Sequence, residues 1–249
     1  MEALESIRSL FLPCSIGRRP CTDMPASPPA DRGVQPRNPQ AAVRVLATTE
    51  VALILGLIFL IVWVVEPLGL PGIDLALRAL IGVLLILSPW LHHDSFDRLG
   101  LRLDNFWKAM AGVLPISLVA ASVALGAGFF LKSIDPPRSV PVALAEYFAW
   151  AIAQQFALQS VILRRLEDMG LRGGAPLAGA VLFSFVHAPN PGLLLLTFLG
   201  GLLWCSTFRR NPNLVAVALS HAILAVVIVS TLPPEATGGY RIGPPYLAR

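Results

Sequence analysis

The sequence predicts an all-α membrane protein, a polytopic bundle of about seven transmembrane helices. Three observations lead to this fold class. Of the 249 residues, 55% are hydrophobic and 14% are charged, whereas about a quarter of the residues are charged in soluble domains. The mean hydropathy is +0.68. Long apolar runs also recur along the chain, and roughly 20 apolar residues form a helix that crosses a bilayer.

Seven apolar segments are candidates for these crossings. The fifth and sixth are the weakest, because the sequence HAPNPG at residues 187–192 divides one apolar region in two. The seven predicted spans cover residues 51–65, 75–91, 109–130, 142–163, 175–188, 193–208 and 214–232.

The distribution of basic residues predicts the orientation of the bundle. Cytoplasmic loops of membrane proteins carry an excess of Lys and Arg. With a cytoplasmic N-terminus, fourteen of the 19 basic residues fall inside and four outside, and Arg78 lies within the second span. We therefore expect seven spans in the plasma (inner) membrane, with an external C-terminus. The basic residues are spread over loops, so the pI near 9.3 indicates membrane orientation and no nucleic-acid partner.

Composition divides the chain into three parts. Residues 1–45 are rich in proline and polar residues and are predicted to be a disordered tail, in which Met24 is an alternative start codon. Residues 46–94 contain two N-terminal transmembrane helices, and residues 95–249 contain the core. The three scattered cysteines form neither a disulfide framework nor a metal knuckle.

Polar side chains in three of the predicted spans fall at a similar depth. At roughly 1.5 Å per helical residue, Gln154, His187 and His221 lie about 15, 22 and 16 Å from the basic residues that flank their helices. In hydrocarbon roughly 30 Å thick, polar groups usually turn inward and find partners. We expect one inward-facing cluster of glutamine and histidine. The alternative is separate interhelical hydrogen bonds, each worth about 0.6 to 2 kcal/mol.

Helical spacing refines this cluster. Gln155 and Gln159 are four residues apart and share one helix face, and Gln154 faces about 100° away. Phe183 and His187 are likewise four residues apart. The neighbouring Arg164 and Arg165 are interpreted separately, as markers of the cytoplasmic boundary.

At these residues the chain resembles the CPBP family of intramembrane proteases, also called the Abi or CAAX-processing protease family. The family carries Glu-Glu-x-x-x-Arg on one span, Phe-x-x-x-His on the next and His-x-x-x-Asn or a variant on a later span. Here QQFALQ, FSFVH and HAILA occupy these motifs, after the amphipathic linker FDRLGLRLDNFWKAMAG. The resemblance covers about residues 95–232.

The resemblance implies an intramembrane endopeptidase that acts on a membrane-associated or lipidated peptide. By alignment with the family motifs, five positions are expected to be catalytic. Two further residues are expected to contact substrate. The expected catalytic residues are Gln154, Gln155, Gln159, His187 and His221, and the expected substrate-binding residues are Phe183 and Asn190.

The chain departs from the family pattern at positions that carry catalytic side chains in the family. Gln154 and Gln155 replace the glutamate pair, Gln159 replaces the arginine, and Ala225 replaces the asparagine. A glutamine cannot accept a proton near neutral pH, so it cannot be a general base. Glu146 is a poor substitute, because it points about 180° away from Gln155 on the same helix.

Several alternatives therefore stay open. Either His187 or His221 could act as the base, because neutral imidazole is plausible in an apolar pocket. The cofactor is open, and a metal ion bound by these two histidines lacks support from the ligand count. The alternative function is a non-catalytic pseudoprotease, a binding or scaffold protein for a lipidated peptide, a lipid or a partner helix. A transporter is less favoured, since neither a repeat nor a charged relay is visible.

Overall fold

The computed structural model describes residues 39–248, and this part of the chain is built of helices without any β-strand. Five of its helices are long and apolar enough to cross a membrane, as expected for an integral membrane protein of the all-α class. They cover Gln40–Val65, Pro71–Leu91, Phe106–Leu131, Pro191–Arg210 and Leu214–Thr231.

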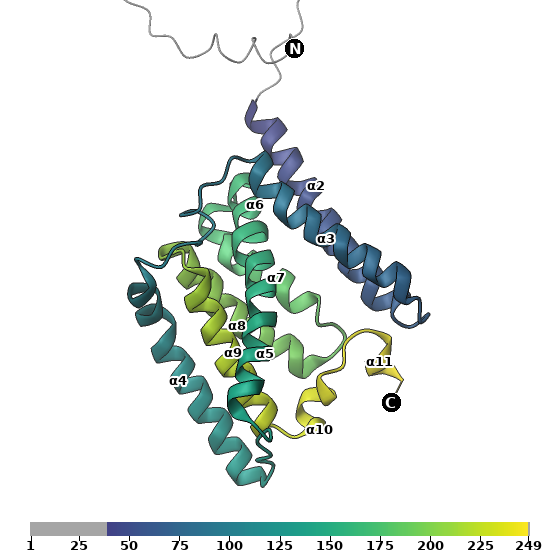
Figure 1. Cartoon of the computed structure of the whole chain (residues 1–249), viewed down its shortest axis with the longest axis vertical. Helices are drawn as coiled ribbons and strands as arrows, with labels where there is room; N and C mark the ends of the chain where they lie inside the picture. Colours follow the sequence, from purple (N-terminus) through teal and green to yellow (C-terminus); the bar gives the residue numbers. More distant parts are fainter. Residues whose placement is uncertain (1–38, 249) are drawn as a thin grey trace, which may run out of the picture. The chain divides into compact units, whose positions relative to one another are not determined.

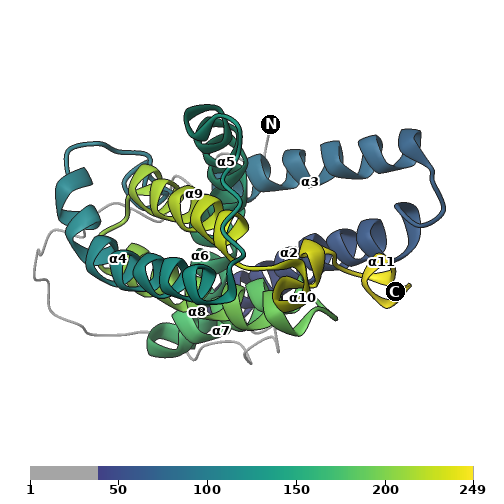
Figure 2. The ribbon, with the colours of Figure 1, turned by 90° about the horizontal axis from the view of Figure 1, so that it is seen from below.

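The described chain starts with a helical hairpin. Helix α2 (Pro39–Leu60) continues through the π-helical turn Ile61–Val65, and α3 (Pro71–Leu91) follows. Large apolar side chains of α3, such as Leu75 and Ile86, are exposed, and Figure 2 shows this helix standing apart from the other helices. In a bilayer these side chains would contact lipid. Contact with lipid avoids the free-energy cost of exposing apolar surface to water.

Helix α2 begins inside the segment that the sequence assigned to a disordered tail. The expected boundary was residue 45, and the helix already begins at Pro39. The remainder of that tail, residues 1–38 with Met24, lies outside the described residues.

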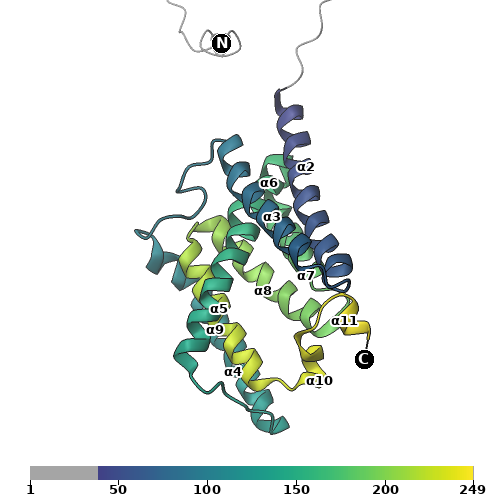
Figure 3. The same cartoon turned by 45° about the vertical axis from the view of Figure 1, so that its right-hand side comes forward.

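The later helices form a bundle around α9 (Leu214–Thr231). Helices α4 (Phe106–Leu131) and α5 (Val140–Gln155) both pack against α9, and α7 (Ala175–Phe185) packs along α8 (Pro191–Arg210). Figures 1 and 3 show these helices gathered beside the α2–α3 hairpin. The α4, α8 and α9 bounds agree with the predicted third, sixth and seventh spans to within a few residues.

Helix α5 does not end at Gln155. It continues through the π-helical segment Phe156–Leu163 into α6 (Arg164–Leu166), so a helical rod covers the whole of the predicted fourth span. The wide π-helical turns begin directly after Gln155 and include Gln159. Such turns are rare inside α-helices and often occur at functional sites.

Helix α7 is shorter than the predicted fifth span. It ends at Phe185, and residues 186–189 form a turn before α8, because two prolines follow closely. It lies tightly against α8, since a Cβ atom added to Gly201 would be 3.0 Å from the Cα atom of Ala180. At roughly 1.5 Å per residue, α7 is about 16 Å long, which explains why it is absent from the five long apolar helices.

The loops after α3, α6 and α8 are joined to one another, and we call this part of the molecule the basic end. The side-chain amide of Asn213, through Nδ2, donates to the Arg102 carbonyl oxygen at 2.8 Å. Arg209 Nε lies 3.2 Å from Glu167 Oε1. Seven of the eleven described arginines lie in these loops or in the helical segments beside them, at one end of the helices: Arg98, Arg102, Arg164, Arg165, Arg172, Arg209 and Arg210.

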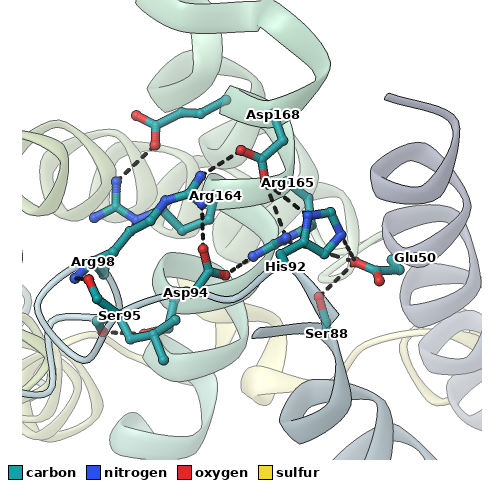
Figure 4. Close-up of polar contacts among 12 residues, drawn as sticks. Glu50, Ser88, His92, Asp94, Ser95, Arg98, Arg164, Arg165 and Asp168 are labelled. Atoms are coloured by element: carbon teal, nitrogen blue, oxygen red, sulfur yellow. Dashed lines mark hydrogen bonds and ion pairs between the residues drawn. The ribbon is translucent and has the colours of Figure 1, made fainter. Parts of the chain in front are cut away.

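A charge cluster at the basic end ties the α2–α3 hairpin to the bundle (Figure 4). Its members come from α2, from the end of α3 and the loop that follows, and from the region around α6. They are Glu50, His92, Asp94, Arg98, Arg165 and Asp168.

Arg165 is the centre of this charge cluster. Its side chain is fully buried, and it pairs with the buried Asp94 and, at 3.1 Å, with Asp168. Arg98 contacts the same two carboxylates. His92 lies between acids of two helices, with Nε2 3.3 Å from Glu50 and Nδ1 3.4 Å from Asp168. Arg165 thus does more than mark a boundary, because it neutralises carboxylates inside the fold.

The opposite end is closed by the C-terminal segment, which contains α10 (Pro234–Thr237) and α11 (Pro244–Leu247). The Gly243 amide donates to the Ala188 carbonyl oxygen at 2.9 Å, and the Tyr240 hydroxyl donates to the carbonyl oxygen of Ile228 at 3.0 Å. The C-terminal segment is therefore fixed to the turn between α7 and α8.

Candidate active site

The structure brings three of the predicted site residues into one hydrogen-bonded chain. Gln155 and Gln159 are fully buried on the same face of the α5–α6 rod. Gln159 Nε2 donates to Gln155 Oε1 at 2.9 Å, and Gln155 Nε2 lies 3.0 Å from His221 Nδ1 in α9. The two glutamines share one face, as predicted, and Gln155 links Gln159 to the histidine of a second helix.

Gln154 lies away from this chain. Its side chain is partly exposed and makes no hydrogen bond with another residue of the described part. The neighbouring positions 154 and 155 thus have different environments, as the angle of about 100° between consecutive helical residues requires.

His187 lies in the turn after α7, and its ring is held by the preceding helical turn. His187 Nδ1 is 2.7 Å from the carbonyl oxygen of Phe183. The Phe183 ring lies edge-on to the rings of His187 and His221, with centroids 5.0 and 6.2 Å away. Phe183 therefore contacts both histidines and completes what we call the glutamine–histidine cluster: Gln155, Gln159, Phe183, His187 and His221.

The sequence analysis did not predict the contacts that Trp204 makes with His221 and Ser220. The Trp204 indole stacks on the His221 ring, with centroids 4.3 Å apart and planes at 24°. Trp204 Nε1 donates to Ser220 Oγ at 3.1 Å, and Ser220 Oγ lies 2.8 Å from Ser117 Oγ of α4. A tryptophan and a serine within apolar spans indicate that polar contacts are present, but neither residue indicates which helix it faces.

The hydrogen bonds determine the tautomer of each neutral imidazole. A carbonyl oxygen only accepts, so His187 Nδ1 carries the proton and His187 Nε2 presents a lone pair. In the amide orientation of this structure, Gln155 Nε2 faces the ring and donates to His221 Nδ1, which assigns the proton of the neutral ring to His221 Nε2. One histidine therefore offers a proton acceptor and the other a hydrogen-bond donor.

Asn190 has its hydrogen-bonding capacity occupied within the fold. Its side-chain oxygen accepts from the Leu193 amide at the start of α8. Its amide group donates to the carbonyl oxygens of Thr237 and Arg241, at 2.8 and 2.9 Å. Asn190 therefore caps α8 and fastens the C-terminal segment, and substrate contact by this residue stays a prediction.

Acidic groups and metal ligands are scarce around the cluster. Glu146 is exposed, nine residues before Gln155 in α5. Among residues 39–248, the structure contains no group of three or more His, Cys, Asp and Glu side chains that could hold a metal ion. Two imidazoles do not complete a catalytic zinc site, which typically has three protein ligands. The functional groups that the glutamine–histidine cluster itself presents are imidazoles and amides.

Part of the chain matches a known protein family. Residues 136–227 match the family described as type II CAAX prenyl endopeptidase, Rce1-like. This segment contains the whole glutamine–histidine cluster and confirms the resemblance over that part of the chain. Searches of curated proteins and of solved structures found no significant match.

Proposed function

Because residues 136–227 match the Rce1-like family, we propose that the chain is an intramembrane endopeptidase that acts on a membrane-associated peptide. The observation that carries this proposal is the pairing of tautomers in the glutamine–histidine cluster. His187 Nε2 can accept a proton, and His221 Nε2 can donate a hydrogen bond. Peptide hydrolysis needs both functions, a base for water and a donor for the developing oxyanion.

In this mechanism, His187 Nε2 removes a proton from water as the water oxygen attacks the peptide carbonyl carbon. His221 Nε2–H donates to the carbonyl oxygen, which becomes negatively charged. When the tetrahedral species collapses, the C–N bond breaks and the His187 proton passes to the leaving amine. Gln155 and Gln159 hold His221 in the donor tautomer, and Trp204 fixes its plane.

A specific observation supports a second candidate function, a binding protein without peptidase activity. The motif positions that carry glutamate in the family hold Gln154 and Gln155, and Gln155 is engaged with His221. An imidazole base alone would be weaker than a base supported by a carboxylate. The same cluster could then hold a lipidated peptide, a lipid or a partner helix and leave it intact.

We also propose seven membrane crossings with the basic end in the cytoplasm. The five long helices supply five crossings, and the α5–α6 rod and α7 with its turn supply the others. The joined loops at the basic end support this, because alternating helices return to the same side. The excess of basic residues predicts that this side is cytoplasmic, in the plasma (inner) membrane.

The test is cleavage of prenylated and other membrane-anchored peptides by the full-length protein in lipid, followed by mass spectrometry. We expect low but measurable cleavage that is lost in His187→Ala and in His221→Ala. His93→Ala is the matched control, since His93 is an exposed histidine outside the cluster. Peptide binding without cleavage, with binding lost in His221→Ala, would replace the endopeptidase by the binding protein.

A further inference from the structure

We propose that a cavity at the basic end binds a phosphate group, carried either by an anionic phospholipid or by a soluble phosphate. The cavity has a volume of about 480 Å³, within the roughly 300 to 1,000 Å³ of small-ligand sites. It lies between the start of α2 and the loop after α6. Its charged lining consists of Arg44, Glu167, Asp168 and Arg172.

The two acidic residues of this lining are already paired with other arginines. Glu167 lies 2.8 Å from Arg164 Nη1 and 3.2 Å from Arg209 Nε. Asp168 belongs to the charge cluster, 2.6 Å from Arg98 and 3.1 Å from Arg165. The negative charges of Glu167 and Asp168 are therefore neutralised by arginines that do not line the cavity.

The two basic residues are not balanced in this way. Neither Arg44 nor Arg172 forms an ion pair with a carboxylate of the described chain, and both are exposed. The Arg44 guanidinium lies against the loop that carries Arg172, since its Nη2 atom is 3.5 Å from the position of a Cβ on Gly170. Two unpaired guanidinium groups in one cavity suit a phosphate, whose oxygens accept several N–H bonds.

The position of the cavity favours a lipid headgroup as one source of this phosphate. Arg44 lies near the first residue of the candidate span Gln40–Val65, so its side chain reaches the depth at which headgroups begin. Under the proposed orientation this leaflet is cytoplasmic, where anionic lipids concentrate. The inference uses that orientation and does not depend on peptidase activity.

The experiment measures lipid retained by the full-length protein after purification from bilayers of phosphatidylcholine with or without phosphatidylglycerol, using native mass spectrometry. We expect preferential retention of phosphatidylglycerol, reduced about tenfold or more for each arginine removed in Arg44→Gln and Arg172→Gln, because each substitution removes a hydrogen bond between charged groups. Arg210→Gln is the matched control, because it removes an exposed charge at the same end but outside the cavity. It should leave retention unchanged.

A second arm distinguishes the two sources. Inorganic phosphate that raises the melting temperature of delipidated wild type, but not of the double glutamine variant, would assign a soluble phosphate. Its lack of effect, with lipid preference intact, would assign the headgroup. If the double glutamine variant does not fold, Arg44→Lys with Arg172→Lys keeps both charges and should keep the lipid preference. Equal retention of both lipids by wild type together with no phosphate effect, or an equal loss in Arg210→Gln, would overturn the proposal.

Discussion

At the scale of single residues, the chemistry of the cluster depends on which ring nitrogen of each histidine is protonated. The Gln155 amide makes His221 Nδ1 an acceptor. A carboxylate at this position would do the reverse, because an ionised carboxylate only accepts and would require a proton on Nδ1. The replacement of glutamate by glutamine therefore changes what His221 presents, from a lone pair at Nε2 to an N–H group.

This difference predicts a spectroscopic result that does not require enzymatic activity. In wild-type protein labelled with ¹⁵N-histidine, NMR chemical shifts should show a proton on Nδ1 of His187 and on Nε2 of His221. Gln155→Glu, measured where its carboxyl is ionised, should move the His221 proton to Nδ1. Gln154→Glu is the matched control and should leave the tautomer unchanged, because the hydrogen bond to His221 Nδ1 comes from Gln155. A wild-type His221 protonated at Nδ1 would contradict the hydrogen-bond assignment.

At the level of helices, two groups of buried polar contacts hold segments of the chain together in addition to apolar packing. The charge cluster joins the α2–α3 hairpin to the α5–α6 rod through Arg165. Asn190 joins the start of α8 to the C-terminal segment. Both groups of contacts are buried, so removal of one partner leaves other polar groups without partners at considerable cost.

Arg165→Met should destabilise the protein by about 3 to 5 kcal/mol, because it leaves the buried Asp94 carboxylate without its main partner. The measurement is reversible denaturant unfolding in detergent. Arg210→Met removes an exposed arginine at the same end and should change the free energy of unfolding by less than about 0.5 kcal/mol. Equal effects of the two substitutions would show that the charge cluster contributes little to stability.

Asn190→Ala should cost about 1 to 2 kcal/mol through loss of the α8 cap, and it should release the C-terminal segment. Limited proteolysis should then cleave residues 234–247 faster than in wild type. Asn211→Ala, at a partly exposed asparagine after α8, serves as control. An unchanged cleavage rate in Asn190→Ala would mean that other contacts, such as that of Tyr240, suffice to hold the segment.

For the whole molecule, the proposed membrane arrangement rests on the distribution of basic residues. Reporter fusions at Arg249 should be active only when the reporter functions outside the cytoplasm, and fusions within the loop after α6 should give the opposite result. This outcome follows from the fourteen-to-four distribution of basic residues across the predicted sides. A cytoplasmic signal at Arg249 would contradict seven crossings with a cytoplasmic N-terminus.

The sequence predicted the features that depend on local periodicity. Apolar runs located the helices, and the i, i+4 spacing correctly placed Gln155 and Gln159 on one face, because a helix repeats every 3.6 residues. It did not predict that Trp204 stacks on His221, or that Arg165 reaches Asp94. Such contacts depend on how helices rotate against one another, and almost uniformly apolar spans carry little information about rotation.

We propose that the glutamine–histidine cluster is a peptidase site in which amides replace carboxylates. The most direct measurement is the rate of cleavage of a membrane-anchored peptide by wild type, Gln154→Glu, Gln155→Glu and the double variant, each also with Gln159→Arg. We expect the smallest gain from Gln154→Glu and the largest from the double variant with Gln159→Arg. Since general-base catalysis contributes about 10² to 10⁴ in rate, that gain should be large. Folded variants that bind the peptide yet cleave it no faster than wild type would contradict the claim.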